Sequence, residues 1–276
     1  MSSTDLLDAC VLVGDSITQT TQNDTLYQHL SEYFERRLDV VNRGHGGFNT
    51  EWTIPVLKRA LTPKVKADQG HGQKIRVMTL WLGTNDAALP PAATHVPVDQ
   101  YKANLHEIIS LVKSPDSPYY SPETKIILLT PPPVIAEVWR KGVADWAILS
   151  GLMSPEEMVA ERDHDPKVMA GYAKACLEVG QEAGLDAINV HAGIIEAAGG
   201  DSPAKLLPYF SDGIHMTGKG YDVVFTLFKE LIERKYPKLT PANMVMGIID
   251  FSLLGKGDIE ALIAENQEKY HAQWTA

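Results

Sequence analysis

The sequence is poor in the residues that mark several classes of protein. It has only two cysteines, Cys10 and Cys176, which are too few and too far apart for a disulfide framework or a zinc site. Basic residues are outnumbered, with 25 Lys and Arg against 35 Asp and Glu, and the formal net charge is −10. Because an acidic surface repels phosphate backbones and anionic lipids, we expect neither nucleic-acid binding nor membrane-surface binding.

Long apolar runs are also missing. The run at residues 9–13 is too short for the core of a signal peptide, and no run approaches the ~20 residues of a membrane-spanning helix. We therefore expect no membrane insertion and a cytoplasmic location. Hydrophobic residues still make up 44% of the 276 residues, which is enough to build a full core.

Short β-branched runs alternate with longer amphipathic stretches along the chain. The runs that predict strands are residues 9–13, 39–41, 75–82, 125–130 and 187–190. The stretches that predict helices are residues 26–38, 50–61, 98–112, 166–183 and 218–236. This alternation predicts right-handed crossovers and a parallel sheet. The fold class is therefore α/β, a three-layer α/β/α sandwich around a five-stranded parallel sheet with flavodoxin-like strand order 2-1-3-4-5.

Two regions exceed this basic unit. Residues 135–165 form an insertion after the fourth predicted strand; they are too many for a structureless loop, so we interpret them as a helical lid or pocket wall. The main domain spans residues 1–240, and residues 241–276 form a C-terminal extension with a Gly-rich break at 254–258 and a helix at 259–274. The extension either packs on its own domain or crosses to another subunit, which would make the protein a homo-oligomer.

Two segments carry residues suited to nucleophilic catalysis. The segment Gly14-Asp15-Ser16 directly follows the first predicted strand, at the edge where ligands bind in parallel sheets. A serine there needs an adjacent base to attack a substrate. Asp212 and His215 are three residues apart, so the carboxylate can hold one imidazole tautomer and leave the other ring nitrogen for the serine. Each segment alone also fits a simpler interpretation, a helix cap or a surface histidine.

Two further segments follow the second and third predicted strands. Asn85, within Gly83–Asp86, can donate its side-chain N–H to a developing oxyanion. The glycines of Gly44–Gly47 let backbone amides approach a ligand, or form a simple turn. They do not match Gly-x-Gly-x-x-Gly, and the histidines show no metal-ligand spacing. We therefore expect neither a cofactor nor a metal.

In order and spacing, these four segments resemble the four blocks of the SGNH hydrolase family, also called GDSL-like esterases and lipases. The resemblance covers about residues 9–236. The strings Gly-Asp-Ser-Ile-Thr-Gln, Gly-Thr-Asn-Asp-Ala and Ser-Asp-Gly-Ile-His are most similar to the isoamyl acetate-hydrolysing esterase subgroup. No Gly-x-Ser-x-Gly elbow surrounds Ser16, which argues against the α/β-hydrolase fold.

The resemblance implies a serine esterase that acts on a small-molecule ester without a cofactor. It implies that His215 takes the proton of Ser16, that Asp212 stabilises the imidazolium, and that an acyl-serine intermediate forms. It also implies an oxyanion hole made by the backbone N–H groups of Ser16 and Gly47 and by the side chain of Asn85.

Supporting roles follow for neighbouring residues. We expect Asp15 and Asp86 to fix their loops through backbone hydrogen bonds, and Thr84 to touch the pocket wall. We expect short, acetyl-type acyl groups, because Trp139 and Trp146 of the insertion can cap a small pocket.

Two departures from the subgroup bear on the substrate. The glycine block reads His45-Gly46-Gly47, where the subgroup more often has an aromatic residue and a serine before the glycine, and the insertion at 135–165 is longer than usual. The family also includes carbohydrate O-deacetylases, thioesterases and lysophospholipases, which stay open as alternatives. A non-catalytic binding module would keep the fold but would not need the reactive residues that all four blocks retain.

Overall fold

Five parallel strands form one sheet in the order β2-β1-β3-β4-β5 in the computed structural model, which describes residues 7–21, 24–68, 71–253, 255 and 257–274. The strands are β1 (Ala9–Gly14), β2 (Asp39–Gly44), β3 (Ile75–Trp81), β4 (Lys125–Leu129) and β5 (Asp186–Ile188). The predicted fold class and strand order are thus confirmed. The change of direction along the chain falls between β1 and β3, so the loops after these strands meet at one edge of the sheet.

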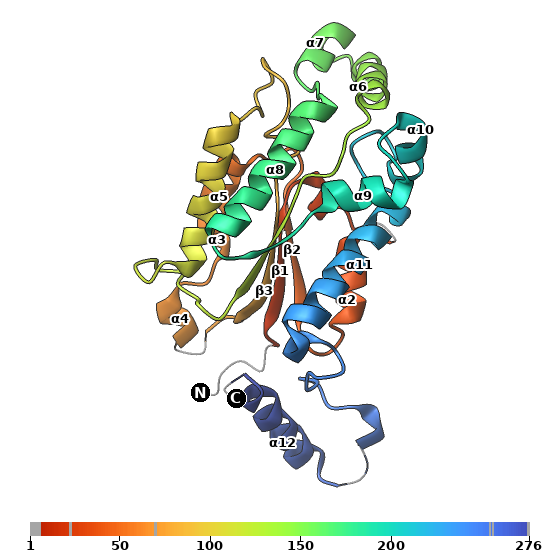
Figure 1. Cartoon of the computed structure of the whole chain (residues 1–276). Coiled ribbons are helices and arrows are strands. Elements are labelled where there is room, and N and C mark those ends of the chain that lie inside the picture. Colours follow the sequence, from red (N-terminus) through yellow and green to blue (C-terminus); the bar gives the residue numbers. More distant parts are fainter. Residues whose placement is uncertain (1–6, 22–23, 69–70, 254, 256, 275–276) are drawn as a thin grey trace.

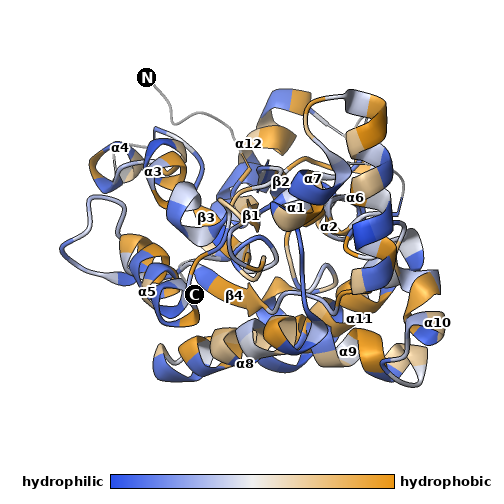
Figure 2. Ribbon diagram, turned by 90° about the horizontal axis from the view of Figure 1, so that it is seen from above, coloured by the Kyte–Doolittle hydropathy of each residue, from blue (hydrophilic) through white to orange (hydrophobic). Residues whose placement is uncertain are grey.

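Helices cover both faces of the sheet and complete the three layers (Figure 1). On one face, α5 (Val98–Lys113) packs against α3 (Thr50–Ala60) and against α8 (Pro166–Glu182). On the other, α11 (Gly218–Lys235) packs against α2 (Leu26–Tyr33) and α9 (Val190–Ala198). Seen from above, the two groups of helices enclose the strands from opposite sides (Figure 2). The shorter elements are α1 (Ser16–Gln19), α4 (Lys64–Asp68), α10 (Pro203–Leu206) and the 3-10 turns Leu207–Tyr209, Pro237–Leu239 and Phe251–Leu253.

The central strands are buried on both faces, as expected for a parallel sheet between two helical layers. Leu12, Met78 and Leu128 are each 0% exposed. Full burial of one such side chain stabilises the fold by about 1.5–3 kcal/mol. These strands therefore hold their carboxyl ends, and the loops that begin there, on a rigid base.

Several predicted elements differ from the structure at their ends, and in two of them the structure shows the reason. The helix predicted at 26–38 stops at Tyr33, because Phe34 leaves the helical conformation and Arg36 has a φ of 59°. The strand predicted at 187–190 stops at Ile188. Asn189 then caps α9, accepting a hydrogen bond from the Ala192 N–H at 3.0 Å, and the sequence pattern had not indicated a helix here.

The insertion at 135–165 forms two helices, α6 (Ala136–Ser150) and α7 (Pro155–Ala160), which pack against each other. Arg140 of α6 forms an ion pair with Asp163, with 2.6 Å between Nε and Oδ1. His164 is 4% exposed, and its Nε2 lies 2.9 Å from the carbonyl oxygen of Thr84. The end of the insertion is thus tied to the loop after β3.

The C-terminal extension ends in α12 (Ile259–Ala272), which lies at the opposite end of the molecule from α6 and α7 (Figure 1). Tyr270 is 2% exposed; its hydroxyl donates to the Arg37 carbonyl and accepts from the Asp8 N–H, both at 2.8 Å. The extension therefore packs on its own chain, and assembly through it stays a prediction. Leu254 and Lys256 of the predicted break at 254–258, like residues 1–6, lie outside the described residues. No helix in the described ranges has the length and apolar character needed to cross a bilayer.

Candidate active site

Ser16 is the first residue of α1 and follows β1 after a single residue, Asp15. Asp15 caps this helix, and its Oδ1 accepts a hydrogen bond from the Ile17 N–H at 2.9 Å. Because the first N–H groups of a helix have no acceptor within it, the backbone N–H of Ser16 is open to an external oxygen. Capping thus presents the hydroxyl and the amide of the same residue at the sheet edge.

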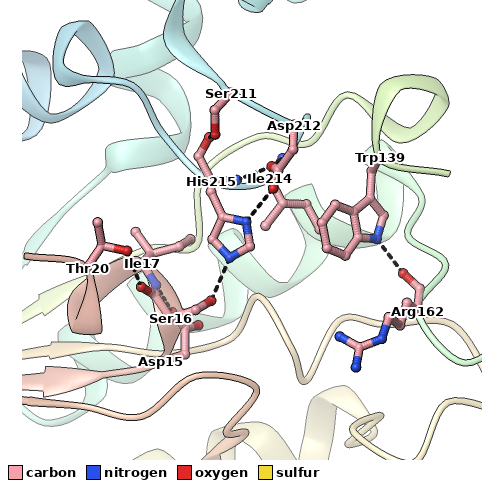
Figure 3. A network of polar contacts seen from close by, with 10 residues as sticks. All are labelled: Asp15, Ser16, Ile17, Thr20, Trp139, Arg162, Ser211, Asp212, Ile214 and His215. Carbon is pink, nitrogen blue, oxygen red and sulfur yellow. Dashed lines mark hydrogen bonds and ion pairs between the residues drawn. The ribbon is translucent and has the colours of Figure 1, made fainter. Parts of the chain in front are cut away.

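Three side chains from distant segments form a hydrogen-bonded chain (Figure 3). The Ser16 Oγ lies 2.9 Å from Nε2 of His215, and Nδ1 of His215 lies 2.6 Å from Oδ2 of Asp212. The other carboxylate oxygen of Asp212 accepts hydrogen bonds from the backbone N–H groups of Ile214 at 3.0 Å and His215 at 2.8 Å. The predicted segments therefore meet in the arrangement of alcohol, imidazole and carboxylate.

The pKa shifts of His215 and Asp212 suit proton transfer from Ser16. The hydrogen bond to Asp212 raises the pKa of His215, although partial burial of the ring opposes the shift. Burial raises the pKa of Asp212, but the hydrogen bond and charge of His215 and the two backbone N–H groups outweigh it, so the net shift is downward. Asp212 is therefore ionised at neutral pH, and the His215 ring is a stronger base than a free imidazole.

The loop of Asp212 and His215 docks on the start of the insertion. Gly213 has a φ of 96°, and a Cβ there would meet the Ile135 carbonyl oxygen at 2.6 Å, so only glycine fits this approach. The Ile135 N–H in turn donates to the Gly213 carbonyl at 2.8 Å. The Trp139 ring then lies edge-on to the His215 ring, with 5.9 Å between centroids.

Gly47 and Asn85 lie in neighbouring loops that can form an anion pocket. Gly47 has a φ of 78°, which favours glycine, and a Cβ there would meet nothing within 4 Å, so open space adjoins it. The Asn85 Nδ2 donates to the Phe48 carbonyl at 2.9 Å, which holds the amide beside the glycine loop. A primary amide has a second N–H, which stays available to a ligand. Gln19 of α1 accepts a hydrogen bond from the Gly46 N–H and ties this loop to the Ser16 segment.

The supporting residues act mainly through the backbone. Asp86 is 0% exposed, and its Oδ1 accepts hydrogen bonds from the backbone N–H of Thr50 at 3.0 Å and from the Thr50 hydroxyl. Burial raises the pKa of Asp86 to about 7, although the hydrogen bonds from Thr50 oppose the shift. Burial also raises the pKa of Asp15 to about 7, although the hydrogen bond from the Ile17 N–H and the charge of His215 oppose this shift.

Thr84 is not itself among the residues that line the cavity beside the site, but it contacts His164, which is one of them. The residue is 4% exposed, and its carbonyl oxygen faces the His164 ring. Thr84 therefore anchors the end of the insertion through this contact.

A cavity of about 480 Å³ adjoins the two loops that carry Gly47 and Asn85, and we refer to it as the insertion cavity. Trp139, Trp146 and Met153 of the insertion form one side. Phe48 and Trp52, whose rings meet edge-on with 6.1 Å between centroids, form another. Such an apolar lining with a few polar groups is typical of small-molecule sites.

Several lining residues of this cavity were not predicted as site residues, and Arg162 and His164 are two of them. Arg162 lines the cavity, and its guanidinium lies over the Trp146 ring, 5.3 Å from the centroid. His164, interpreted from sequence as an ordinary core or surface histidine, is a buried residue that also lines the cavity. No local pattern identifies either residue, because their placement depends on contacts with segments about 16–80 residues away.

Comparison with known proteins places these features in a wider group. Residues 12–223 match the GDSL-like Lipase/Acylhydrolase family. The chain is 33% identical over 257 residues to the isoamyl acetate-hydrolyzing esterase 1 homolog of Bos taurus, covering 90% of this chain and 92% of the relative. It is 26% identical to the isoamyl acetate-hydrolyzing esterase of Saccharomyces cerevisiae, covering 87% and 92%. The crystal structure of a lipase/acylhydrolase from Enterococcus faecalis has the same fold, with a TM-score of 0.57 at 20% identity, covering 83% of this chain and 97% of that chain.

Proposed function

Since the chain belongs to the GDSL-like lipase/acylhydrolase family and is a carboxylic ester hydrolase, we propose that it hydrolyses small esters through an acyl intermediate on Ser16. The observation that carries this proposal is the continuous hydrogen-bonded chain from Ser16 through His215 to Asp212. A serine hydroxyl within hydrogen-bond reach of an oriented imidazole is the minimum arrangement for nucleophilic attack.

In the proposed reaction, the Ser16 Oγ attacks the ester carbonyl while Nε2 of His215 takes its proton. The carbonyl oxygen becomes an anion held by the backbone N–H groups of Ser16 and Gly47 and by the Asn85 amide. His215 then gives the proton to the departing alcohol oxygen, leaving an acyl group on Ser16. Water then attacks the acyl group while Nε2 of His215 takes its proton, and His215 returns this proton to the Ser16 oxygen as the carboxylic acid leaves. Asp212 stabilises the imidazolium in both halves of the reaction.

We propose acetyl-type acyl groups, with the alcohol part of the ester in the insertion cavity. Trp139 supports this assignment, because it contacts the His215 ring and also lines the cavity. The alcohol oxygen must lie at Nε2 of His215 to be protonated, so the group attached to it can extend past Trp139. The cavity that Trp139 and Trp146 line has a volume of about 480 Å³, so it is not the small acyl pocket predicted from the sequence. It is much larger than an acetyl group needs and suits an alcohol of several carbons.

The proposal is tested by hydrolysis of a chromogenic acetyl ester with and without a serine-directed phosphonate. We expect turnover in the parent protein, loss of turnover after phosphonate treatment, and loss of turnover in Ser16→Ala with an unchanged circular dichroism spectrum. Turnover at the parental rate in Ser16→Ala would refute the nucleophile assignment. More rapid hydrolysis of decanoyl than of acetyl esters would refute the short acyl preference.

A further inference from the structure

One cationic side chain that lines the insertion cavity has no acidic partner among the described residues. Arg162 lies two residues after the end of α7 and lines the cavity together with Gly47 and Asn85. Its guanidinium contacts the Trp146 ring, but no ion pair joins it to a carboxylate within the part of the chain that the structure describes. By contrast, Arg140 of the same insertion is paired with Asp163.

The backbone of Arg162 is held more firmly than its exposed position suggests. Its carbonyl oxygen accepts a hydrogen bond from Nε1 of Trp139 at 2.6 Å and lies 2.8 Å from Nδ1 of His164. Trp139 is the residue that contacts His215, so the same contacts that fix Arg162 also relate it to the triad. Figure 3 shows the guanidinium extending beneath the Trp139 ring toward the side on which Ser16 lies.

Other charges near the cavity do not neutralise this guanidinium. Glu161 also lines the cavity, but its Oε2 accepts a hydrogen bond from the Ala93 N–H at 3.2 Å and it forms no ion pair with Arg162. His164 is buried, and burial lowers its pKa, so its ring is neutral at pH 7. Arg162 is thus the cavity's one positive group among the lining residues, in a protein with a net charge of −10.

We propose that Arg162 is a specificity residue that binds a carboxylate on the alcohol part of the ester. This inference rests on the proposed function, in which the alcohol part fills the insertion cavity. A guanidinium presents two parallel N–H donors to a carboxylate, and stacking on Trp146 limits the orientations of that fork. The preferred substrates are accordingly acetyl esters of hydroxy acids. Without the guanidinium, the acidic surface of the protein repels the carboxylate of these esters and makes them poor substrates.

The test compares esters of equal chain length that differ in charge. Acetylated ω-hydroxy acids of four, five and six carbons are compared with the matching alkyl acetates and with the matching uncharged amides, and acetate release is measured. In the parent protein we expect a higher kcat/KM for the carboxylate than for the amide at one or more chain lengths. Arg162→Gln should lower kcat/KM for that carboxylate about fivefold to tenfold, mainly through KM, because an exposed charge-assisted contact is weaker than a buried one.

Three controls isolate the contact. Arg234→Gln also removes one positive charge, but from the last turn of α11. This turn lies about 24 Å along the helix axis from the end of α11 that is near the site, so the carboxylate preference should not change. Arg162→Lys keeps the charge without the planar fork and should retain only part of the preference. Glu161→Gln removes the acidic neighbour of Arg162 and should strengthen the preference for the carboxylate.

The outcomes separate the inference from the proposed function. Hydrolysis of alkyl acetates that depends on Ser16, with no carboxylate preference at any chain length, would overturn the role of Arg162 alone. A carboxylate preference that survives Arg162→Gln, or one seen only for anionic acyl groups such as adipate monoesters, would also overturn it. If none of the acetyl esters is hydrolysed, neither the alkyl acetates nor the acetylated hydroxy acids and amides, the proposed function itself fails.

Discussion

Replacement of Asp212 by asparagine tests how the carboxylate controls the imidazole. In the structure, Oδ1 accepts hydrogen bonds from the backbone N–H groups of Ile214 and His215, and only Oδ2 faces the ring. In Asp212→Asn, the amide oxygen must take the Oδ1 position to satisfy the two backbone donors. The amide NH2 then points at Nδ1 of His215, which has to become an acceptor. The ring proton moves to Nε2, where it faces the hydroxyl that Nε2 should deprotonate.

The size of this effect follows from the same contacts. In the opposite orientation, the amide oxygen of the introduced side chain faces Nδ1 of His215 and preserves the working tautomer. This orientation leaves the two backbone N–H groups without an acceptor, at a cost of about 1–3 kcal/mol each. That orientation is therefore populated in about one molecule in thirty or fewer. With the added loss of imidazolium stabilisation, we expect kcat for an acetyl ester to fall by about 10³–10⁴-fold.

The assay is steady-state hydrolysis of 4-nitrophenyl acetate, with nitrogen-15 NMR of His215 to report the ring tautomer. Asp116→Asn, an exposed change away from the site, serves as the matched control and should keep parental kcat. A kcat for Asp212→Asn within tenfold of the parent, or a ring proton still on Nδ1, would refute the reasoning.

Three further predictions concern the oxyanion pocket, a buried acid and the C-terminal extension. Asn85→Ala should lower kcat about 10²–10³-fold with little change in KM, since the donor acts on the developing anion; an equal change in KM would point to loop collapse instead. Asp86 has a pKa of about 7 when folded, so the folded state binds more protons than the unfolded state from about pH 4 to 7, and its contribution to stability falls as the pH rises through that range. Asp86→Asn should therefore flatten the fall in Tm over this range, and an unchanged slope would contradict the burial argument. Tyr270→Phe leaves the Asp8 N–H and the Arg37 carbonyl without their partner and should cost about 1–3 kcal/mol of unfolding free energy, measured by denaturant titration, while kcat stays at the parental value.

Local sequence patterns were sufficient to predict the frame of the molecule. A strand such as β1 is a continuous apolar run ended by Gly14 and Asp15, and its position in the alternating pattern fixes where its carboxyl end lies. The residues at those ends then meet because parallel strands share one edge. Ser16 could be placed at this edge from the strand pattern alone. Asp212 and His215 follow no strand, and their pairing with Ser16 was implied by the resemblance to the four blocks of the SGNH hydrolase family.

Elements set by single backbone conformations or by distant partners could not be predicted in this way. The helix ending at Tyr33 depends on the left-handed conformation of Arg36, a residue that carries no turn signal. Asn189 was passed over as a cap because the apolar run appeared to continue through Val190. Arg162 acquires its position largely through contacts with Trp139, Trp146 and His164, and no spacing rule relates these residues.

The central claim is that Ser16 carries the acyl group during turnover. The most direct measurement is mass spectrometry of the protein quenched in acid during hydrolysis of an acetyl ester, followed by digestion and peptide mapping. We predict the added mass of one acetyl group on the peptide that contains Ser16, and no such adduct in Ser16→Ala. An adduct on a different residue, or sustained turnover by the parent protein with an unmodified Ser16 peptide, would contradict the account.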